Sequence, residues 1–220
     1  ARAAAMPGVK VVGLDCHIGS QITQVSPYLD ALDKLLALVR QLQRQGIVIE
    51  HLDLGGGIGI RYTDETLLSP GVLLDKVYAR LSEEQLDDLQ IVLEPGRSLV
   101  GNAGVLLTRV EYLKHTEARN FAIVDAAMND LLRPTLYDAW HDVEAVKQPT
   151  ASAPAQTYDI VGPICESGDW LAKARSLALQ QGDLLAIMSA GAYAFTMASQ
   201  YNTRPRPAEV MVDGTEFHVV

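Results

Sequence analysis

Three times in its first hundred residues the chain runs from a short apolar stretch into a polar or glycine-rich turn. The apolar stretches are residues 9–15, 47–54 and 90–94, and helical patterns follow the first two of them, at residues 26–46 and 69–81. A short apolar run that ends at a turn is typical of a buried strand in a parallel sheet, in which helices connect consecutive strands. We therefore expect three consecutive strand–helix units, the repeat of a (β/α) barrel.

The first helical pattern has clear boundary signals. Ser26 and Pro27 predict an N-cap followed by proline at the first helical position, and Gly46 predicts the end of the helix. Leucine and valine recur at helical spacing between these limits, so one face of this helix should be buried.

After Gly101 the pattern changes to short β-type runs separated by Gly, Pro, Asn and Asp. These runs are residues 105–114, 121–125, 143–147, 158–161, 184–188, 209–212 and 217–220, and residues 149–154 predict an exposed loop. The expected fold class is α/β plus β. Residues 1–103 should form the last part of a (β/α)8 TIM-like barrel, and residues 104–220 a C-terminal mainly β domain, either a β-sandwich or a β-barrel-like sheet.

Features at both ends of the chain predict that it is part of a longer protein. The chain starts without Met in an Ala-rich segment, and its last β-type run stops in mid-strand. An intact barrel has eight units, so we expect very roughly 150 residues or more upstream of the three units seen here.

Composition excludes some classes of partner. The net charge of -9 and the pI of about 5.0 argue against binding to a nucleic-acid backbone, which requires a basic face. No apolar run approaches the roughly 20 residues that span a bilayer, so we expect a cytoplasmic protein without membrane partners. Cys16 and Cys165 are too few for a disulfide framework and are expected to be thiols.

The third apolar stretch ends in Glu94-Pro95-Gly96-Arg97, which places an acid, a rigid turn and a guanidinium within four residues. The carboxyl ends of barrel strands are where this architecture places its ligands, so Glu94 and Arg97 are candidate site residues. The alternative is an ion pair in an ordinary turn.

Two further signals follow the other apolar stretches. Gly55, Gly56 and Gly57 would let backbone amides approach an anion such as a phosphate, although a purely structural turn has the same composition. A Rossmann loop is excluded because Ile60 occupies the position of its third glycine. His17 can stack on a planar cofactor or transfer a proton, or simply form a hydrogen bond in the core.

The β region carries three more candidates. Cys165 lies in a polar turn, where a thiol can act as an acid or nucleophile or be an ordinary loop residue. Arg133 and Tyr137, four residues apart, can clamp a carboxylate or form a surface pair. Tyr193 follows a strand and a tight turn, from which a phenol can reach a ligand or pack.

The order of these motifs is more specific than any one of them. The chain contains, in this order, H-I-G-S, L-D-L-G-G-G-I-G, E-P-G-R, R-P-T-L-Y-D-A, G-P-I-C-E-S-G-D and S-A-G-A-Y. This series resembles the diaminopimelate decarboxylase family, which has the alanine-racemase-like fold of pyridoxal-phosphate enzymes, and the resemblance covers essentially the whole chain. The Cys-Glu-Ser-Gly-Asp motif and the Arg133–Tyr137 motif favour this branch over ornithine and arginine decarboxylases.

The resemblance implies a decarboxylase that converts meso-2,6-diaminopimelate to L-lysine and CO₂ in lysine biosynthesis, with pyridoxal 5'-phosphate as cofactor and no metal. It also implies a homodimer with shared active sites, to which Cys and Glu come from the neighbouring subunit. In the family, Glu94 pairs with the pyridine nitrogen and Cys165 protonates the product carbanion. The other implied cofactor contacts are His17, Ser20, Gly55, Gly56, Gly57, Pro95, Gly96, Arg97 and Tyr193, and the implied substrate contacts are Arg97, Arg133, Tyr137, Glu166 and Tyr193.

One family residue has no counterpart here. The Schiff-base lysine lies near the start of the family's barrel, and none of Lys10, Lys34, Lys76, Lys114, Lys147 and Lys173 sits in a matching motif. We therefore expect this segment alone to be inactive. It should also be prone to aggregation, because an incomplete barrel exposes edge strands and lacks part of its core. The alternatives are another basic amino-acid decarboxylase of the same fold, of the ornithine or arginine type, and a non-catalytic homologue that acts as a binding protein.

Overall fold

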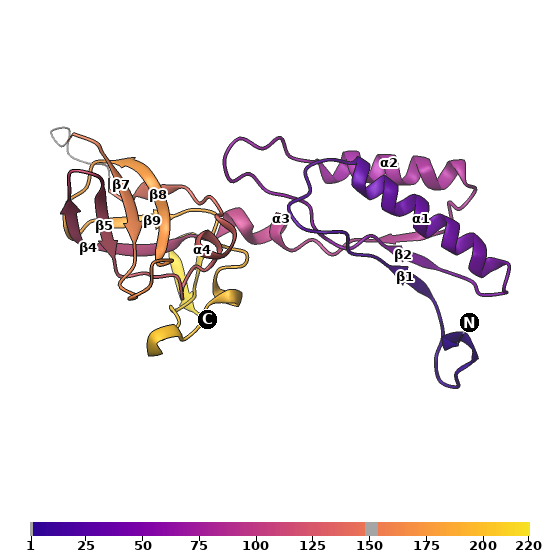
Figure 1. The fold of residues 1–220 in the computed structure, drawn as a ribbon. Helices are drawn as coiled ribbons and strands as arrows, with labels where there is room; N and C mark the ends of the chain where they lie inside the picture. Colours follow the sequence, from indigo (N-terminus) through magenta and orange to yellow (C-terminus); the bar gives the residue numbers. More distant parts are fainter. Residues whose placement is uncertain (1, 148–153) are drawn as a thin grey trace. The chain divides into compact units, whose positions relative to one another are not determined.

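The computed structural model describes residues 2–147 and 154–220, which form two compact units, Ala1–Leu99 and Val100–Val220 (Figure 1). Except for Pro154, the predicted loop at residues 149–154 lies outside the described residues. Among the described residues, no helix is long and apolar enough to cross a membrane.

The first unit is a three-stranded parallel sheet with two long helices. Its strands β1 (Gly13–Asp15), β2 (His51–Asp53) and β3 (Gln90–Val92) lie in the order β1-β2-β3. Helices α1 (Ser26–Gln43) and α2 (Pro70–Glu83) connect them, and the four-residue helix α3 (Arg97–Val100) follows β3. The predicted strand–helix repeat is thus confirmed.

The two long helices bury one stripe each against the sheet. Tyr28, Leu32, Leu35, Leu36 and Val39 of α1 pack with Leu73, Val77 and Leu81 of α2 in one core that also contains Leu52 and Leu54. Figure 1 shows both helices on the same face of the sheet. Burial of this apolar surface is the main stabilising contribution in the unit.

The start of α1 differs from the prediction by one residue. Val25, not Ser26, is the N-cap residue, and no side chain caps this helix end. The end of α1 agrees with the prediction, because Gly46 adopts the left-handed conformation (φ +74°) and the Ile47 amide donates back to the Leu42 carbonyl.

The second unit is built on a six-stranded mixed sheet of order β6-β9-β4-β5-β7-β8. The strands are β4 (Leu106–His115), β5 (Asn120–Val124), β6 (Val143–Ala145), β7 (Gln156–Val161), β8 (Trp170–Leu177) and β9 (Leu184–Ile187). Only β5 and β7 pair in parallel. The end strands β6 and β8 contact each other, so the sheet is nearly closed. Of the two expected forms, the β domain takes the barrel-like one.

The core of this unit lies inside the curved sheet. Alternate residues of the strands point inward, among them Val110, Val124, Ile160 and Leu185, which are completely buried. The short helix α4 (Arg133–Tyr137) contacts β8. The sequence patterns predicted neither α4 nor β8.

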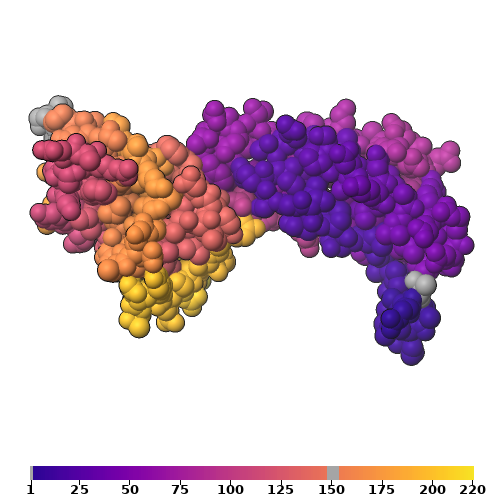
Figure 2. All heavy atoms as spheres, viewed as in Figure 1, coloured from indigo at the N-terminus to yellow at the C-terminus, as the bar shows by residue number. Residues whose placement is uncertain are grey.

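The chain ends in a separate antiparallel hairpin of β10 (Val210–Asp213) and β11 (Glu216–Val219). Every residue of both strands is exposed. In Figure 2 the C-terminal segment, coloured yellow, stands out from the body of its unit.

Candidate active site

The carboxyl ends of β1, β2 and β3 bring together predicted site residues of the first unit. The register pairs Asp15 with Asp53 and Asp53 with Val92, so the strands end at one edge of the sheet. His17, Gly55 and Glu94 each stand two residues after one of these strand ends, and Gly56 and Gly57 follow Gly55. This edge is where parallel α/β sheets bind their ligands.

Hydrogen bonds connect the glycine triplet to both of its neighbours. The Gly56 amide donates to Nδ1 of His17 at 3.3 Å, and the Gly55 carbonyl accepts from the Glu94 amide at 2.9 Å. His17 therefore accepts at Nδ1, which leaves the proton of a neutral ring on Nε2. The structure thus brings His17, the triplet and Glu94 into one hydrogen-bonded group.

The triplet is so closely packed that it has no room for side chains. A Cβ atom on Gly56 would lie 2.2 Å from the carbonyl oxygen of Glu94, and one on Gly57 would lie 2.2 Å from that of Gly19. Gly57 also has φ +94°, which is strained for any other residue. From α1, the buried Tyr28 hydroxyl donates to the Gly56 carbonyl at 2.8 Å. The loop is therefore rigid and lined by backbone.

We expect Gly56→Ala to lower the free energy of unfolding of the protein by about 1–3 kcal/mol, the usual cost of forcing extra atoms into a packed site. The new methyl group would push the Glu94 carbonyl away. Denaturant titration measures the effect. Gly71→Ala is the matched control, because its Cβ would meet only Ser69 Oγ at 3.7 Å. Equal free energies of unfolding for the two variants would show that the loop accommodates the methyl group without loss of stability.

Three carboxylates gather beside the triplet. Oxygen atoms of Asp15, Asp53 and Glu94 all lie within 4.8 Å of one another, and Asp53 Oδ1 also accepts from the Gly55 amide at 2.8 Å. Their charges add, so this edge favours a cationic group. Our sequence reasoning missed Asp15 and Asp53, although each stands at the end of its apolar run.

Arg97 connects two other loops of the first unit. Its Nη2 donates to Ser20 Oγ at 2.9 Å, and its Nη1 donates to the Tyr62 hydroxyl. The structure thus brings the predicted pair Ser20 and Arg97 together and adds Tyr62, which no motif indicated. Pro95 and Gly96 are exposed, and a Cβ on Gly96 would meet nothing within 4 Å.

In the second unit, Arg133 is held in a buried polar contact. Its Nη1 lies 2.8 Å from Nε2 of the completely buried His141, and Nδ1 of His141 lies 2.8 Å from the Met188 carbonyl. A neutral His141 that donates from Nδ1 and accepts from Arg133 at Nε2 satisfies both contacts. Arg133 is buried whereas Tyr137 is 63% exposed, so the guanidinium does not lie in a surface pair, which was one reading of the sequence. No motif pointed to His141.

Cys165 and Glu166 are exposed in a tight turn between β7 and β8, and Cys165 is a free thiol, as is Cys16. From α4, Thr135 Oγ1 donates to the Gly168 carbonyl at 2.5 Å and fixes one side of this turn. Helix α4 therefore supports both Arg133 and the turn that carries the thiol.

Tyr193 ends a loop that is tightly packed on residues 100–104, the segment that precedes β4. A Cβ on Gly191 would lie 1.8 Å from the Val100 carbonyl oxygen, and the Ala190 amide donates to the Gly104 carbonyl at 2.8 Å. Tyr193 has φ +60°, an uncommon conformation for an aromatic residue, and its side chain is 43% exposed. The loop presents the phenol at the surface.

The predicted residues thus form two sets, one in each unit. His17, Ser20, the glycine triplet, Glu94 and Arg97 belong to the first unit, and Arg133, Tyr137, Cys165, Glu166 and Tyr193 to the second. The first set combines a backbone-lined glycine loop with a cluster of negative charge, which suits a ligand that has both an anionic and a cationic group.

The chain is similar to known proteins. Residues 10–191 match the family model described as the C-terminal sheet domain of pyridoxal-dependent decarboxylases. A diaminopimelate decarboxylase of Pseudomonas aeruginosa is 62% identical over 222 aligned positions, which cover 100% of this chain and 52% of that protein.

Solved structures of diaminopimelate decarboxylases are also similar to this chain. The diaminopimelate decarboxylase of Helicobacter pylori complexed with L-lysine has a TM-score of 0.88 at 38% identity, covering 99% of this chain and 53% of that one. The enzyme of M. jannaschii in co-complex with L-lysine has a TM-score of 0.91 at 37% identity, covering 99% and 50%. The chain therefore spans about half the length of the curated relatives it matches.

Proposed function

Since the chain belongs to the pyridoxal-dependent decarboxylases of the ornithine, diaminopimelate and arginine group, we propose that the whole protein is a diaminopimelate decarboxylase. It would convert meso-2,6-diaminopimelate to L-lysine and CO₂ as the last step of lysine biosynthesis. The observation that carries this proposal is the placement of the glycine loop, His17 and Glu94 at one sheet edge, in a chain that is 62% identical to a relative of that name.

The residues of the first unit fit pyridoxal phosphate. The glycine loop excludes side chains, which lets backbone approach a phosphate, and the three carboxylates favour a protonated ring nitrogen. When bound, the cofactor takes up the electron pair that the departing carboxylate leaves behind. The family attaches this cofactor covalently through a lysine, and none of the motifs of this chain contains that lysine.

We assign the individual roles as the family resemblance implies. His17 covers one face of the ring, Glu94 holds the ring nitrogen protonated, and Cys165 Sγ–H delivers the proton that replaces CO₂ at Cα. The phosphate contacts would be Ser20, Gly55, Gly56, Gly57 and Gly96, and further cofactor contacts would be Pro95, Arg97 and Tyr193. The substrate contacts would be Arg97, Arg133, Tyr137, Glu166 and Tyr193. Arginine suits a substrate with two carboxylates because its fork binds them bidentately.

A direct assay tests the proposed function. The purified whole protein, supplied with pyridoxal phosphate, should release CO₂ from meso-diaminopimelate with a kcat/KM at least about tenfold above that for L-ornithine or L-arginine. Preference for ornithine or arginine would move the protein to another branch of its family. Absence of turnover on all three would favour a non-catalytic homologue.

We also propose a homodimer with shared active sites, in which Cys165 and Glu166 serve the cofactor site of the second copy. The division of the predicted residues between two compact units supports this arrangement. We also propose that residues 1–103 bind the cofactor and that the protein is located in the cytoplasm. Cell fractionation tests the location.

A further inference from the structure

Tyr201 contacts one of the proposed substrate residues although no sequence motif singled it out. It lies in the short 3-10 helix Tyr201–Thr203, and its hydroxyl donates to Glu166 Oε2 at 3.3 Å. Both residues are exposed. The nearby charge of Glu166 raises the pKa of the Tyr201 phenol, with smaller contributions from burial, this hydrogen bond and Cys165. The phenol therefore remains a hydrogen-bond donor.

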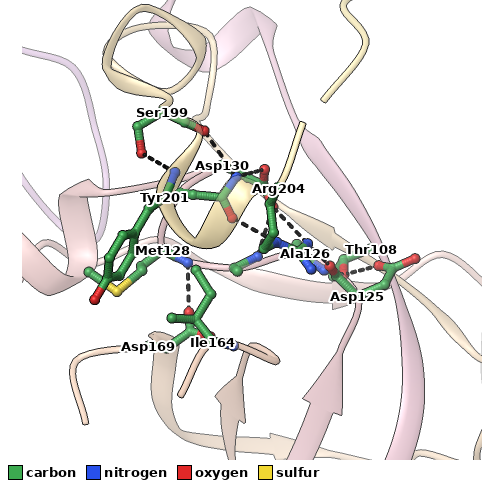
Figure 3. Close-up of polar contacts among 12 residues, drawn as sticks. Thr108, Asp125, Ala126, Met128, Asp130, Ile164, Asp169, Ser199, Tyr201 and Arg204 are labelled. Atoms are coloured by element: carbon green, nitrogen blue, oxygen red, sulfur yellow. Dashed lines mark hydrogen bonds and ion pairs between the residues drawn. The ribbon is translucent and has the colours of Figure 1, made fainter. Parts of the chain in front are cut away.

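The residues on either side of Tyr201 are anchored to one turn, residues 125–130, most of which is buried. The Ser199 amide donates to the Asn129 carbonyl at 2.9 Å, and Asn129 Nδ2 donates to the Ser199 carbonyl at 3.2 Å. Arg204 donates to Asn129 Oδ1 at 2.9 Å and to the Asp125 carbonyl at 2.6 Å, and it lies 3.7 Å from Asp130 Oδ2. Figure 3 shows Arg204 beside Asp125 and Asp130.

The turn that carries Glu166 is anchored to the same support. Asp169 Oδ1 accepts from the Met128 amide and Oδ2 from the Ile164 amide, both at 2.6 Å (Figure 3). Asp169 is buried, and burial raises its pKa, although the two amides and Arg204 act against that rise. Tyr201 and Glu166, 35 residues apart in sequence, are thus positioned by one common turn.

Backbone conformation adds to this placement. Asn202 and Thr203 have φ +53° and +57°, two consecutive left-handed residues immediately after Tyr201. Thr203 is β-branched, for which this conformation is unfavourable. Such conformations persist only where the surrounding structure imposes them, as the anchors at Ser199 and Arg204 do here.

A carboxylate that is already held by a hydrogen bond loses less freedom when it binds a cation. We propose that Tyr201 is a specificity-determining residue, which positions Glu166 to bind the distal ammonium group of the substrate. This inference rests on the proposed function, in which Glu166 meets that ammonium. Tyr201 acts through Glu166 and not on the reacting atoms.

The test compares two inhibitors of the whole enzyme in wild type and Tyr201→Phe. L-lysine keeps the distal ammonium as its α-amino group, because the carbon that loses CO₂ becomes C6 of the product. The compound 6-aminohexanoate has the same carbon chain, carboxylate and C6 amine without that group. We expect the inhibition constant of L-lysine and the KM for meso-diaminopimelate to rise about three- to tenfold, the effect of losing one partly exposed hydrogen bond to a charged group. The inhibition constant of 6-aminohexanoate should stay the same, and kcat should change less than about twofold.

Two further variants complete the design. Tyr78→Phe removes the hydroxyl of a comparably exposed tyrosine on α2 and should leave both inhibition constants unchanged. In Glu166→Gln, adding Tyr201→Phe should have no further effect, because the two residues act as a unit.

The outcomes separate the two proposals. Wild-type turnover of meso-diaminopimelate with unchanged inhibition constants in Tyr201→Phe would overturn the inference alone, as would an equal rise for L-lysine and 6-aminohexanoate. A wild-type enzyme that does not act on meso-diaminopimelate would overturn the proposed function and this inference with it.

Discussion

Replacing Cys165 with alanine in the whole protein is expected to lower kcat for meso-diaminopimelate by about 10²–10⁴-fold, the range typical of a lost general acid. The thiol is free and exposed in its turn, so it can reach a substrate carbon. Alanine removes the S–H proton and little else, because the turn is held by Asp169 and Thr135 and not by Cys165. Steady-state kinetics measure the loss.

Cys16→Ala is the matched control for this variant. Cys16 is the other free cysteine, half-buried beside the core of the first unit, and burial, with the charges of Asp15 and Asp53, raises the pKa of its thiol. We expect most of the activity to remain. A Cys165→Ala enzyme as fast as wild type would identify Cys165 as an ordinary loop cysteine.

Glu94→Gln is expected to lower kcat by about 10²–10³-fold, as removal of one preorganised electrostatic group does in other enzymes. Glutamine keeps the shape and the backbone hydrogen bond to Gly55 but loses the charge that would hold a ring nitrogen protonated. Asp15 and Asp53 remain nearby and limit the loss. Kinetics with excess pyridoxal phosphate measure kcat, and absorbance of the bound cofactor shows whether the site is still occupied.

Glu50→Gln is the control, because Glu50 is an exposed acid that pairs with Lys10. Mixing the two inactive variants then tests the shared site. If Cys165 serves the neighbouring copy, reassociated mixed dimers regain about a quarter of the wild-type activity, because half of the dimers are mixed and each has one intact site. No recovery would place both residues in the site of one copy.

Local patterns predicted the first unit well and the second less completely. Apolar runs and glycine turns identified β1 to β3, but β1 begins at Gly13 and not at residue 9. The reason is a long-range irregularity: the Glu50 and His51 amides both donate to the Val12 carbonyl, which interrupts the ladder. Such an interruption depends on a partner about 40 residues away and leaves no local signal.

Strand β8 and helix α4 escaped prediction for two different reasons. Trp170–Leu177 contains Lys, Arg and two Ala residues, and both Leu171 and Ala172 are buried, so its burial does not alternate as in a half-buried strand. Arg133–Tyr137 is too short for a helical period, and its first residue is held by the buried His141. Tertiary contacts decide both elements.

The site residues divide in the same way. Those in a dense motif, such as the glycine triplet and Glu94, were identified from sequence. Asp15 and Asp53 take their place from the register of β1 with β2, and Tyr201 from a contact across 35 residues. A strand register and a distant hydrogen bond are properties of the folded chain and cannot be predicted from a single local pattern.

The strand order of the six-stranded sheet also has a consequence for how the second unit is made. Strand β9 joins β4 to β6, and its partner Leu106 lies about 80 residues earlier in the chain. While a ribosome synthesises the protein, β4 can form its hairpin with β5 early, yet its other edge must wait until Leu184–Ile187 has emerged. Pairing across such a separation is slow, because the intervening loop must close first. Until then, β4 keeps one unpaired edge, which makes it the strand most in need of protection on the nascent chain.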